Sequence, residues 1–553
     1  MHIFLFFFPG ILLVFSRDFN RKPLSELLIY MVGSSLSFFV VLSWFIKYLH
    51  LPLTVFAYLV LICTLLLLFY GRKKIDLKAI KADRGEMMIA GIFLFILLLR
   101  CAPMFLQIAP AGGDMSMHSY IARLIYDNDG IPSSYEPILP ISNFGAYPSG
   151  FPTLSALVSL LGDIPVYRSG LLMACMAHAL ICFGLYIFLL RYFDRNTSAA
   201  TSIAATFLTR SPQWVIRWGG NPTVLALFFF IVAFSLIIEL KKNPSWPKMV
   251  FASVALAAVL ITHSIVFYIG GMILVLYFLL SIKDFEDPYA TAGWLVICML
   301  ALLLPYLASL KFTLARSAIE ATRVWQATDA QSVLYDLAGG VPFLALSAFG
   351  LPALFKKNRE LAVHFLAITA VILLLILNYR FWIMPFSYLL YPGRVALFLI
   401  IPLAVFAGPY MAKMMTGQKK KLLIALSMIG FSFYCIFYLY NSASMCSVTR
   451  SDMDAFRWMN TVLNKRAVIV NNYGDAGIWI PAVVGMTITD PHKDPVYKEE
   501  LEANLLKLKP DYIYIGSKAV YPVEIRSQDL EKHPWRYRRV YSNGTAQVWK
   551  ILR

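Results

Sequence analysis

The chain has 553 residues, of which 59% are hydrophobic and only 14% are charged. A soluble protein cannot bury that much apolar surface, so the composition predicts a polytopic α-helical membrane protein and argues against a soluble enzyme. The net charge of +18 does not indicate a nucleic-acid partner, because the basic residues gather in short loops between apolar segments, as they do in membrane proteins.

Apolar segments long enough to be considered as membrane spans recur along most of the chain. A hydrocarbon core about 30 Å thick requires roughly 20 apolar residues in a helix. We expect about 14 transmembrane helices, two of them (199–213 and 248–263) short for this purpose. The segments are 2–16, 26–47, 51–70, 87–107, 168–190, 199–213, 222–240, 248–263, 264–281, 291–310, 341–355, 361–378, 391–411 and 422–441.

The loops between these segments predict the orientation of the chain. Threading the segments through a bilayer places the strongly basic loops, 71–86, 241–248, 356–360 and 413–421, on the same side. By the positive-inside rule that side is the cytoplasm. The long loop 108–166 and everything after residue 441 are then extracytoplasmic, in a cell membrane.

Residues 450–553 differ in composition from the rest and predict a small α/β domain, following a transmembrane domain of residues 1–449. Short runs rich in β-branched and aromatic residues predict strands at 467–472, 511–517, 538–542 and 546–552. Helices are expected between them at 451–464 and 495–508, with Ser451 or Asp452 as the cap of the first.

The first long loop opens on "GGDMSMH" (112–118), directly after an apolar segment. Asp114 and His118 are four residues apart and therefore share a face if this stretch is helical. The motif also permits a plainer interpretation, in which Asp114 is the cap of a helix. A capping carboxylate at a helix start can still act on a ligand, so the two interpretations are compatible.

This organisation resembles the GT-C fold glycosyltransferases, membrane-embedded enzymes that use polyprenyl-phosphate-linked sugars. The resemblance rests on Asp114 in the first long loop, on "GIP" (130–132) and "YPSGFP" (147–152), and on the closing α/β segment. It implies that Asp114 is the essential acid of that loop, with Tyr147 in the nearby motif among the substrate-binding residues. Many members carry two acids here, whereas Asp114 has no acidic neighbour, so a divalent cation is left open and no cofactor is expected.

The expected reaction needs a base and a cation. The acceptor hydroxyl loses a proton, for which one carboxylate, Asp114, suffices, and His118 would orient the acceptor or assist the proton transfer. The leaving lipid phosphate needs a cationic partner. Arg394 in "YPGRVALFL" lies near the outward end of an apolar helix and corresponds to the arginine that resembles a lipid-phosphate anchor in the family. Snorkelling of Arg394 to the interface is the plainer alternative.

Other polar residues in outward turns are further candidates for substrate binding. Backbone amides at a helix start favour anions, which makes the turn before the helix at 222–240 a candidate site. An ionisable residue within a membrane segment is costly unless it is paired or functional. The plainer interpretations are an ordinary loop residue for Arg217, a buried helix–helix hydrogen bond for His263 and a solvated charged face for the segment 311–331. The candidates are Arg217 and Asn221 in "WVIRWGGNPTVLAL", His263 in "ITHSIVF", and Arg316 and Arg323 in the outward segment 311–331.

The favoured function is therefore a membrane glycosyltransferase that takes a polyprenyl-phosphate sugar and modifies a glycan, lipid or protein acceptor, among membrane lipids. A polysaccharide polymerase or ligase is the alternative that Arg316, Arg323 and Arg380 would support. A transporter of lipid-linked sugars is disfavoured because the sequence shows no pair of similar halves. Asp490, His492 and Asp494 resemble a metal site only weakly, so the metal ligands stay unknown.

Overall fold

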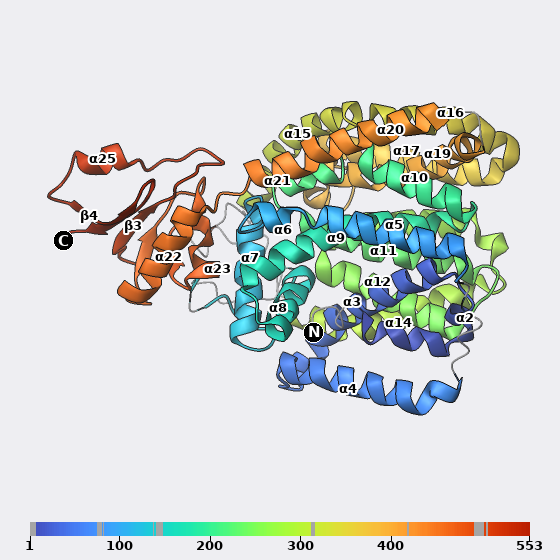
Figure 1. Ribbon diagram of the computed structural model, residues 1–553, viewed down its shortest axis with the longest axis horizontal. Coiled ribbons are helices and arrows are strands. Elements are labelled where there is room, and N and C mark those ends of the chain that lie inside the picture. The colour runs from blue at the N-terminus through green and yellow to red at the C-terminus, as the bar shows by residue number, and fades with distance from the viewer. Residues whose placement is uncertain are drawn as a thin grey trace.

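The computed structural model describes residues 7–74, 80, 82–136, 138–139, 148–310, 316–416, 420–491, 503–504 and 507–553. The chain forms a large body of packed helices with a small sheet region at one end of it (Figure 1). The sheet region is built from the C-terminal residues, as the change in composition near residue 450 predicts.

The helical body follows the apolar segments of the sequence. Its longer helices are α3 (Leu24–Tyr48), α4 (Leu53–Gly71), α5 (Arg84–Arg100), α7 (Asp114–Asp127), α8 (Gly150–Gly162), α9 (Val166–Leu189), α10 (Arg195–Phe207), α11 (Asn221–Leu240), α12 (Trp246–Thr262), α13 (Ser264–Leu280), α14 (Pro288–Ser309), α15 (Arg316–Ala338), α16 (Val341–Lys357), α17 (Arg359–Phe381), α19 (Ile400–Met415) and α20 (Lys420–Phe433). Short turns of helix connect them: α2 (Arg17–Asn20), α6 (Pro103–Leu106), α18 (Pro392–Ala396), α21 (Asn441–Ser444), the 3₁₀ turns η1 (Gly10–Phe15) and η4 (Gln213–Arg217), and the π-helix η8 (Tyr434–Tyr440).

Within the described ranges, nine helices are long and apolar enough to cross a membrane, so the protein is a multi-pass membrane protein. The number rises to ten if Trp325–Ala338 and Val341–Lys357, which meet at 69°, form one bent span. Among the described residues the predicted count of about 14 is not confirmed, because predicted segments such as α12 and α13 are shorter than a full span. The expected helix at 2–16 is wrong in its described part, which forms the 3₁₀ turn Gly10–Phe15.

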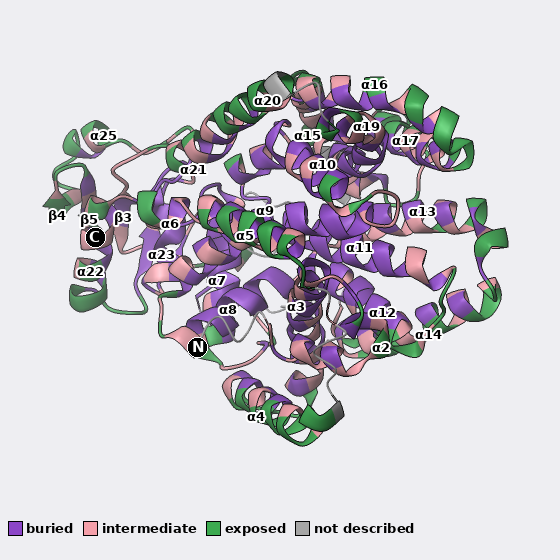
Figure 2. Cartoon of the chain, turned by 45° about the vertical axis from the view of Figure 1, so that its right-hand side comes forward, coloured by how far each residue is buried: buried purple, intermediate pink, exposed green. Residues whose placement is uncertain are grey.

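The packing separates buried helices from lipid-facing ones. Helix α11 is buried almost throughout and packs against α9, α12 and α13. Helix α4 is as apolar as α11 but leaves Leu65, Leu66 and Phe69 exposed, and α4 and α20 lie at the edge of the body (Figure 2). Exposed apolar faces of this extent are stable in lipid and not in water, which supports the membrane assignment.

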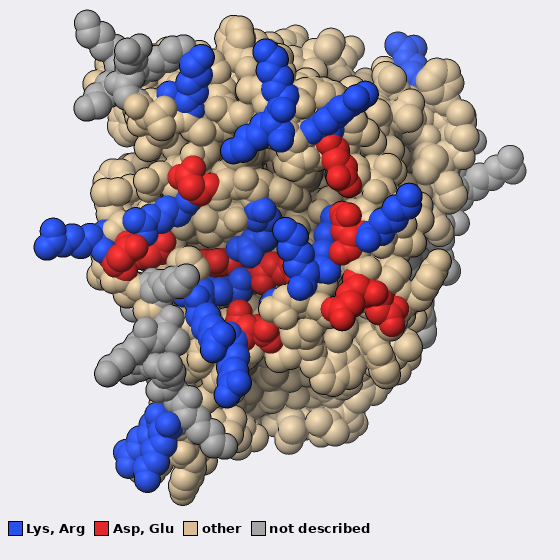
Figure 3. Space-filling view, turned by 90° about the vertical axis from the view of Figure 1, so that its right-hand side faces the viewer, with Lys and Arg blue, Asp and Glu red and all other residues tan. Residues whose placement is uncertain are grey.

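A cluster of buried charges joins the ends of several helices. Lys22 donates to Glu26 (2.8 Å) and Glu239 (2.6 Å), and Arg191 pairs with the same two carboxylates. Lys248 lies 3.5 Å from Glu239. Because a buried charge is costly unless it is paired, this buried cluster fixes how α3, α9, α11 and α12 come together. The surface of the body opposite the C-terminal sheet also carries mixed basic and acidic side chains (Figure 3).

Arg100 is a further buried cation, which ties α5 and η8 to the end of α10 and the start of η4. Its guanidinium donates to the Thr206 carbonyl (3.0 Å) and the Gln213 side chain (3.2 Å) and lies 4.7 Å from the ring of Tyr438. Tyr438 belongs to the π-helix η8 and its hydroxyl donates to the Arg100 carbonyl (2.7 Å). Carbonyl, amide and aromatic groups therefore stabilise this cation, and they anchor the start of η4.

The described residues of the C-terminal region form a five-stranded mixed sheet in the order β2-β1-β3-β5-β4. The central strand β3 is parallel to β1 and antiparallel to β5. The elements are α22 (Arg450–Val462), β1 (Val468–Val470), the 3₁₀ turn η9 (Ala476–Trp479), α23 (Ile480–Val483), β2 (Thr487–Ile488), β3 (Tyr512–Ile515), α25 (Ser527–Glu531), β4 (Tyr537–Asn543) and β5 (Ala546–Ile551).

Four of these strands were expected from the sequence, and the two-residue strand β2 was missed because it is too short to show a pattern. The cap of α22 was also mispredicted. Thr449 is the cap, and Asp452 reaches back to the Thr449 amide in a capping box. Asp452 also accepts from the Tyr514 hydroxyl (2.7 Å), so it joins α22 to β3. Most of the expected helix 495–508 lies outside the described residues.

Asp475 is a buried carboxylate between β1 and η9. It accepts hydrogen bonds from the amides of Gly477 (2.7 Å) and Gly516 (2.8 Å) and from the side chain of Asn472 (3.2 Å). Burial nevertheless raises the pKa of Asp475 to about 6, because it penalises the charged form more than the hydrogen bonds favour it.

The pKa of Asp475 predicts a pH dependence for the C-terminal region. A carboxyl with a raised pKa in the folded state stabilises the fold below pH 4, and this contribution is lost as the pH rises through about 6. The loss is on the order of 2–3 kcal/mol. Hydrogen exchange of the β1 and β3 amides, corrected for intrinsic rates, should show greater protection at pH 5 than at pH 7. Asp475→Asn should flatten this difference, and an unchanged pH dependence in that variant would contradict the assignment.

Candidate active site

Two glycine turns cross at the end of the helical body next to the C-terminal region. Gly112 and Gly219 both have positive φ, +89° and +99°. A Cβ on Gly112 would lie 2.2 Å from the Gly219 nitrogen, and one on Gly219 would lie 2.9 Å from the Met115 nitrogen. Only glycine fits either position, both for its conformational freedom and because backbone meets backbone without room for a side chain.

This crossing places Asp114 at the start of α7. The Asp114 amide donates to the carbonyl of Trp218 (3.2 Å), which belongs to the second turn. Asp114 is the first helical residue and Gly113 is the cap, so the interpretation of Asp114 as the cap itself is wrong. A carboxylate in the first turn is favoured by the positive end of the helix.

His118 lies one helical turn after Asp114 and is buried, as the spacing predicts. Its ring centroid is 5.9 Å from that of Phe151 on α8, in an edge-on arrangement. His263 comes from a different part of the fold, the extended residue that interrupts α12 and α13. Arg394, His118 and Asp114 lie near enough to His263 for their charges to influence it. The structure therefore brings these four predicted residues together.

Arg394 is carried by the short helix α18. Its guanidinium lies 4.7 Å from the ring of Trp218 and 4.8 Å from that of Tyr391. Trp218 is thus shared by the two halves of the site, because its carbonyl accepts from Asp114 and its ring packs on Arg394. The half-buried Arg394 guanidinium therefore packs near two aromatic rings, an arrangement compatible both with a phosphate partner and with snorkelling to the interface.

Asp329 on α15 is a further acid at the site that the sequence did not reveal. Its Oδ2 accepts from the Gly393 amide (2.7 Å) and its Oδ1 accepts from the Ser332 hydroxyl (3.2 Å). Arg394 lies close enough to act electrostatically on it. Asp329 lies in "WQATDAQ" (325–331), which carries no motif, and its Gly393 partner is 64 positions away in the chain, so no local pattern marks it.

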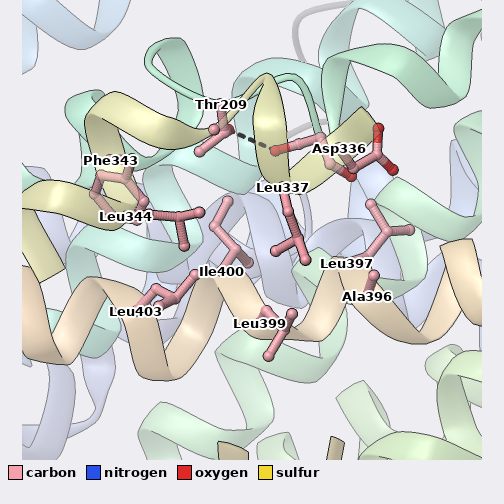
Figure 4. Close-up of a pocket in the computed structure, with 12 residues that line it drawn as sticks. Thr209, Asp336, Leu337, Phe343, Leu344, Ala396, Leu397, Leu399, Ile400 and Leu403 are labelled. Carbon is pink, nitrogen blue, oxygen red and sulfur yellow. Dashed lines mark hydrogen bonds between the residues drawn. The ribbon is translucent and has the colours of Figure 1, made fainter. Parts of the chain in front are cut away.

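A neighbouring cavity lies between the α15–α16 junction, the start of α19 and the loop after α10 (Figure 4). Its walls are mainly apolar, with Leu337, Leu399 and Leu403 among them, and Thr209 and Asp336 are its polar side chains labelled in the view. Arg210 holds Asp336 in an ion pair (3.4 Å) and stacks on Trp214. Because Asp336 is already paired, this cavity lacks the combination of groups found around Asp114.

The other predicted binding residues have different outcomes. Arg217 is exposed at the end of η4 and stacks on Trp214 at 4.7 Å. Asn221 begins α11 as expected, is fully buried and is hydrogen-bonded to His178 (3.1 Å), so it joins α9 to α11. Tyr147 lies outside the described residues. Arg316 and Arg323 lie on α15, and their side chains are outside the described part.

The described residues contain no group of three histidine, cysteine, aspartate or glutamate side chains arranged to hold a metal ion. Of the weak C-terminal candidates, Asp490 is described and accepts from Asn471 through its backbone carbonyl (2.9 Å). His492 and Asp494 lie outside the described residues. The participation of a divalent cation, which the sequence left open, therefore stays an open prediction.

No protein-family model and no curated protein matches the sequence. Among solved structures, an arabinofuranosyltransferase, AftD, from Mycobacteria matches 85% of this chain and 42% of its own, at 12% identity and a TM-score of 0.51. The oligosaccharyltransferase of Archaeoglobus fulgidus, in complex with zinc and sulfate, matches 76% of this chain and 67% of its own, at 13% identity and a TM-score of 0.48. The likeness to the mycobacterial enzyme confirms the resemblance drawn from the sequence: this chain has the fold of a GT-C membrane glycosyltransferase.

Proposed function

We propose that the protein is an inverting membrane glycosyltransferase that moves a sugar from a polyprenyl-phosphate carrier to an acceptor at the extracytoplasmic face of the cell membrane. The convergence of Asp114 and Arg394 carries this proposal, because the two groups share Trp218 and both act on His263. The GT-C fold supports sugar transfer as the reaction class.

Asp114 is the general base of the proposed reaction. The acceptor hydroxyl attacks the anomeric carbon, the bond from that carbon to the phosphate oxygen breaks, and the hydroxyl proton passes to the carboxylate. One carboxylate is sufficient because the leaving group is a phosphate that needs no protonation. His118 and His263 lie near Asp114 and would orient the acceptor hydroxyl toward it.

Arg394 receives the leaving phosphate. Trp218 and Tyr391 pack near its guanidinium and restrict its orientation, and a planar guanidinium offers N–H donors along its edge for two phosphate oxygens. Asp329, bound to the adjacent Gly393 amide, holds α15 against α18 and so supports this orientation.

The proposed orientation places the site outside the cytoplasm. The basic loops predict one cytoplasmic side, and the mixed-charge face of Figure 3 lies at the end of the body remote from the C-terminal sheet. The site adjoins that sheet, so a lipid-linked donor would enter from the outer leaflet.

The polymerase or ligase alternative would depend on arginines of the later loops. Of these, Arg380 is exposed at the end of α17 and donates to the hydroxyl of its neighbour Tyr379 (3.0 Å). This contact gives no specific reason to prefer the polymerase or ligase. The described fold likewise gives no specific reason to prefer a transporter.

Asp114→Asn tests the base. The variant should lower the transfer rate by about 100-fold or more, because amide nitrogen and oxygen cannot take the proton. Transfer from a polyprenyl-phosphate sugar is measured on detergent-solubilised protein, where a transporter would show no turnover. Asp127→Asn, at the exposed end of the same helix, is the matched control and should retain wild-type activity. Full activity of the Asp114 variant would remove it as the base.

Arg394→Gln tests the phosphate partner. Loss of a charge-assisted interaction of about 1.5–3 kcal/mol should raise the KM for the donor roughly 10- to 100-fold. Arg380→Gln, also at a helix end, should leave the KM unchanged. The opposite pattern, with only Arg380 sensitive, would favour the polymerase or ligase.

A further inference from the structure

The C-terminal region reaches the crossing of the two glycine turns through Tyr521. Its hydroxyl accepts from the Gly113 amide (3.3 Å) and donates to the Arg217 carbonyl (3.1 Å). Gly113 immediately precedes Asp114, and Arg217 immediately precedes Trp218. One oxygen atom therefore binds the two chain segments whose crossing forms the candidate site.

We infer that Tyr521 is a positioning residue for the proposed reaction: it fixes the Asp114 turn against the Trp218 turn and so sets the base relative to the arginine that packs on Trp218. This inference rests on the proposed function for its effect on catalysis. The Asp114–Trp218 bond joins the same two turns, but both turns contain a positive-φ glycine, which is the residue with the most conformational freedom. A second attachment is what restricts that freedom.

Tyr521 is itself held rigidly. Its amide and that of Val520 donate to the Gly474 carbonyl (3.2 and 2.8 Å), and its ring packs on Tyr473 with centroids 5.7 Å apart. Asn472 accepts from the amides of Glu524 (3.1 Å) and Ile525 (2.9 Å), which fixes the following residues. The hydroxyl is therefore presented from a fixed loop that is anchored to the end of β1.

The chemistry of the hydroxyl suits this role. Burial raises the pKa of Tyr521, and the nearby Asp114 carboxylate also opposes its ionisation. The phenol accordingly stays protonated near neutral pH, and it needs that proton to donate to the Arg217 carbonyl while a lone pair accepts from Gly113.

Other contacts hold the C-terminal region on the body without touching both turns. Lys518 donates to the carbonyls of Ala443 (2.9 Å) and Cys446 (2.8 Å), and Arg123 donates to that of Ala482 (3.3 Å). Removal of the Tyr521 hydroxyl should therefore leave the region docked and affect only the relative position of the two turns.

Tyr521→Phe on the full-length protein tests the inference, with Tyr541→Phe as the matched control. Tyr541 is a half-buried tyrosine of the same region whose ring packs on Trp458. In the Tyr521 variant, peptides covering residues 112–118 and 216–220 should exchange amide hydrogen faster, with the melting temperature unchanged. The kcat should fall about 10-fold or more, since small displacements of reacting groups cost this much. The KM values for donor and acceptor should stay within about twofold.

Wild-type exchange in the two turns would overturn the inference, and so would a wild-type kcat or a rise in KM without a fall in kcat. The exchange measurement uses no substrate and therefore remains readable if the proposed reaction is wrong. A fully active Asp114→Asn protein, by contrast, would refute the proposed base and leave the exchange result standing.

Discussion

The backbone crossing of Gly112 and Gly219 is the constraint on which the candidate site depends. The two turns come from different loops, one after α6 and one after η4, and they touch through main-chain atoms. Because no side chain separates them, the Trp218 carbonyl reaches the Asp114 amide. The tryptophan ring is then available on the other side for Arg394. An acid and a cation that are 280 positions apart in the chain thereby share one residue as a common support.

The membrane environment explains how the body tolerates the charges that it buries. Its lipid-facing helices expose leucine, phenylalanine and isoleucine, whereas Lys22 and Arg100 are buried and Arg191 is largely so. Each inward cation is compensated differently. Lys22 and Arg191 pair with carboxylates, and Arg100 is held by carbonyl, amide and aromatic groups. Because neutral groups compensate its charge, Arg100 can serve a structural role: it fixes the segment that continues into the Trp218 turn.

Guanidinium–aromatic contacts recur beside the candidate site. Arg394 packs on Trp218, while Arg210 and Arg217 both pack on Trp214. The first pair lies among Asp114, His118 and His263, and Arg210 is bound to Asp336. This difference in partners supports the proposed use of Arg394 as a phosphate partner, whereas Arg210 is bound to Asp336 on α15. The C-terminal region completes the arrangement, since Tyr521 reaches both turns at once.

The sequence by itself determined the features that depend on composition and short-range periodicity. These are the membrane-spanning helical body, the four-residue spacing that puts Asp114 and His118 on one face of a helix, and four of the five C-terminal strands that the structure describes. Apolar runs and the alternation of apolar with polar residues predict these features, because each segment is buried in lipid or in a sheet independently of the others. The number of spans was less well determined, because helices such as α12 and α13 are apolar yet too short to cross on their own.

Only the tertiary structure decided which polar residues meet. His263 lies near Asp114 because the chain breaks between α12 and α13 there, whereas the Asn221 side chain is hydrogen-bonded to His178 inside the body. Asp329 and Tyr521 lacked any local signal, since their importance comes from contacts with backbone groups 64 and more than 300 positions away. Contacts of that kind depend on how helices and loops pack around one another. Local sequence patterns do not encode that packing. The close approach of the Gly112 and Gly219 backbones shows this most clearly, because glycine has no side chain whose type could indicate a contact.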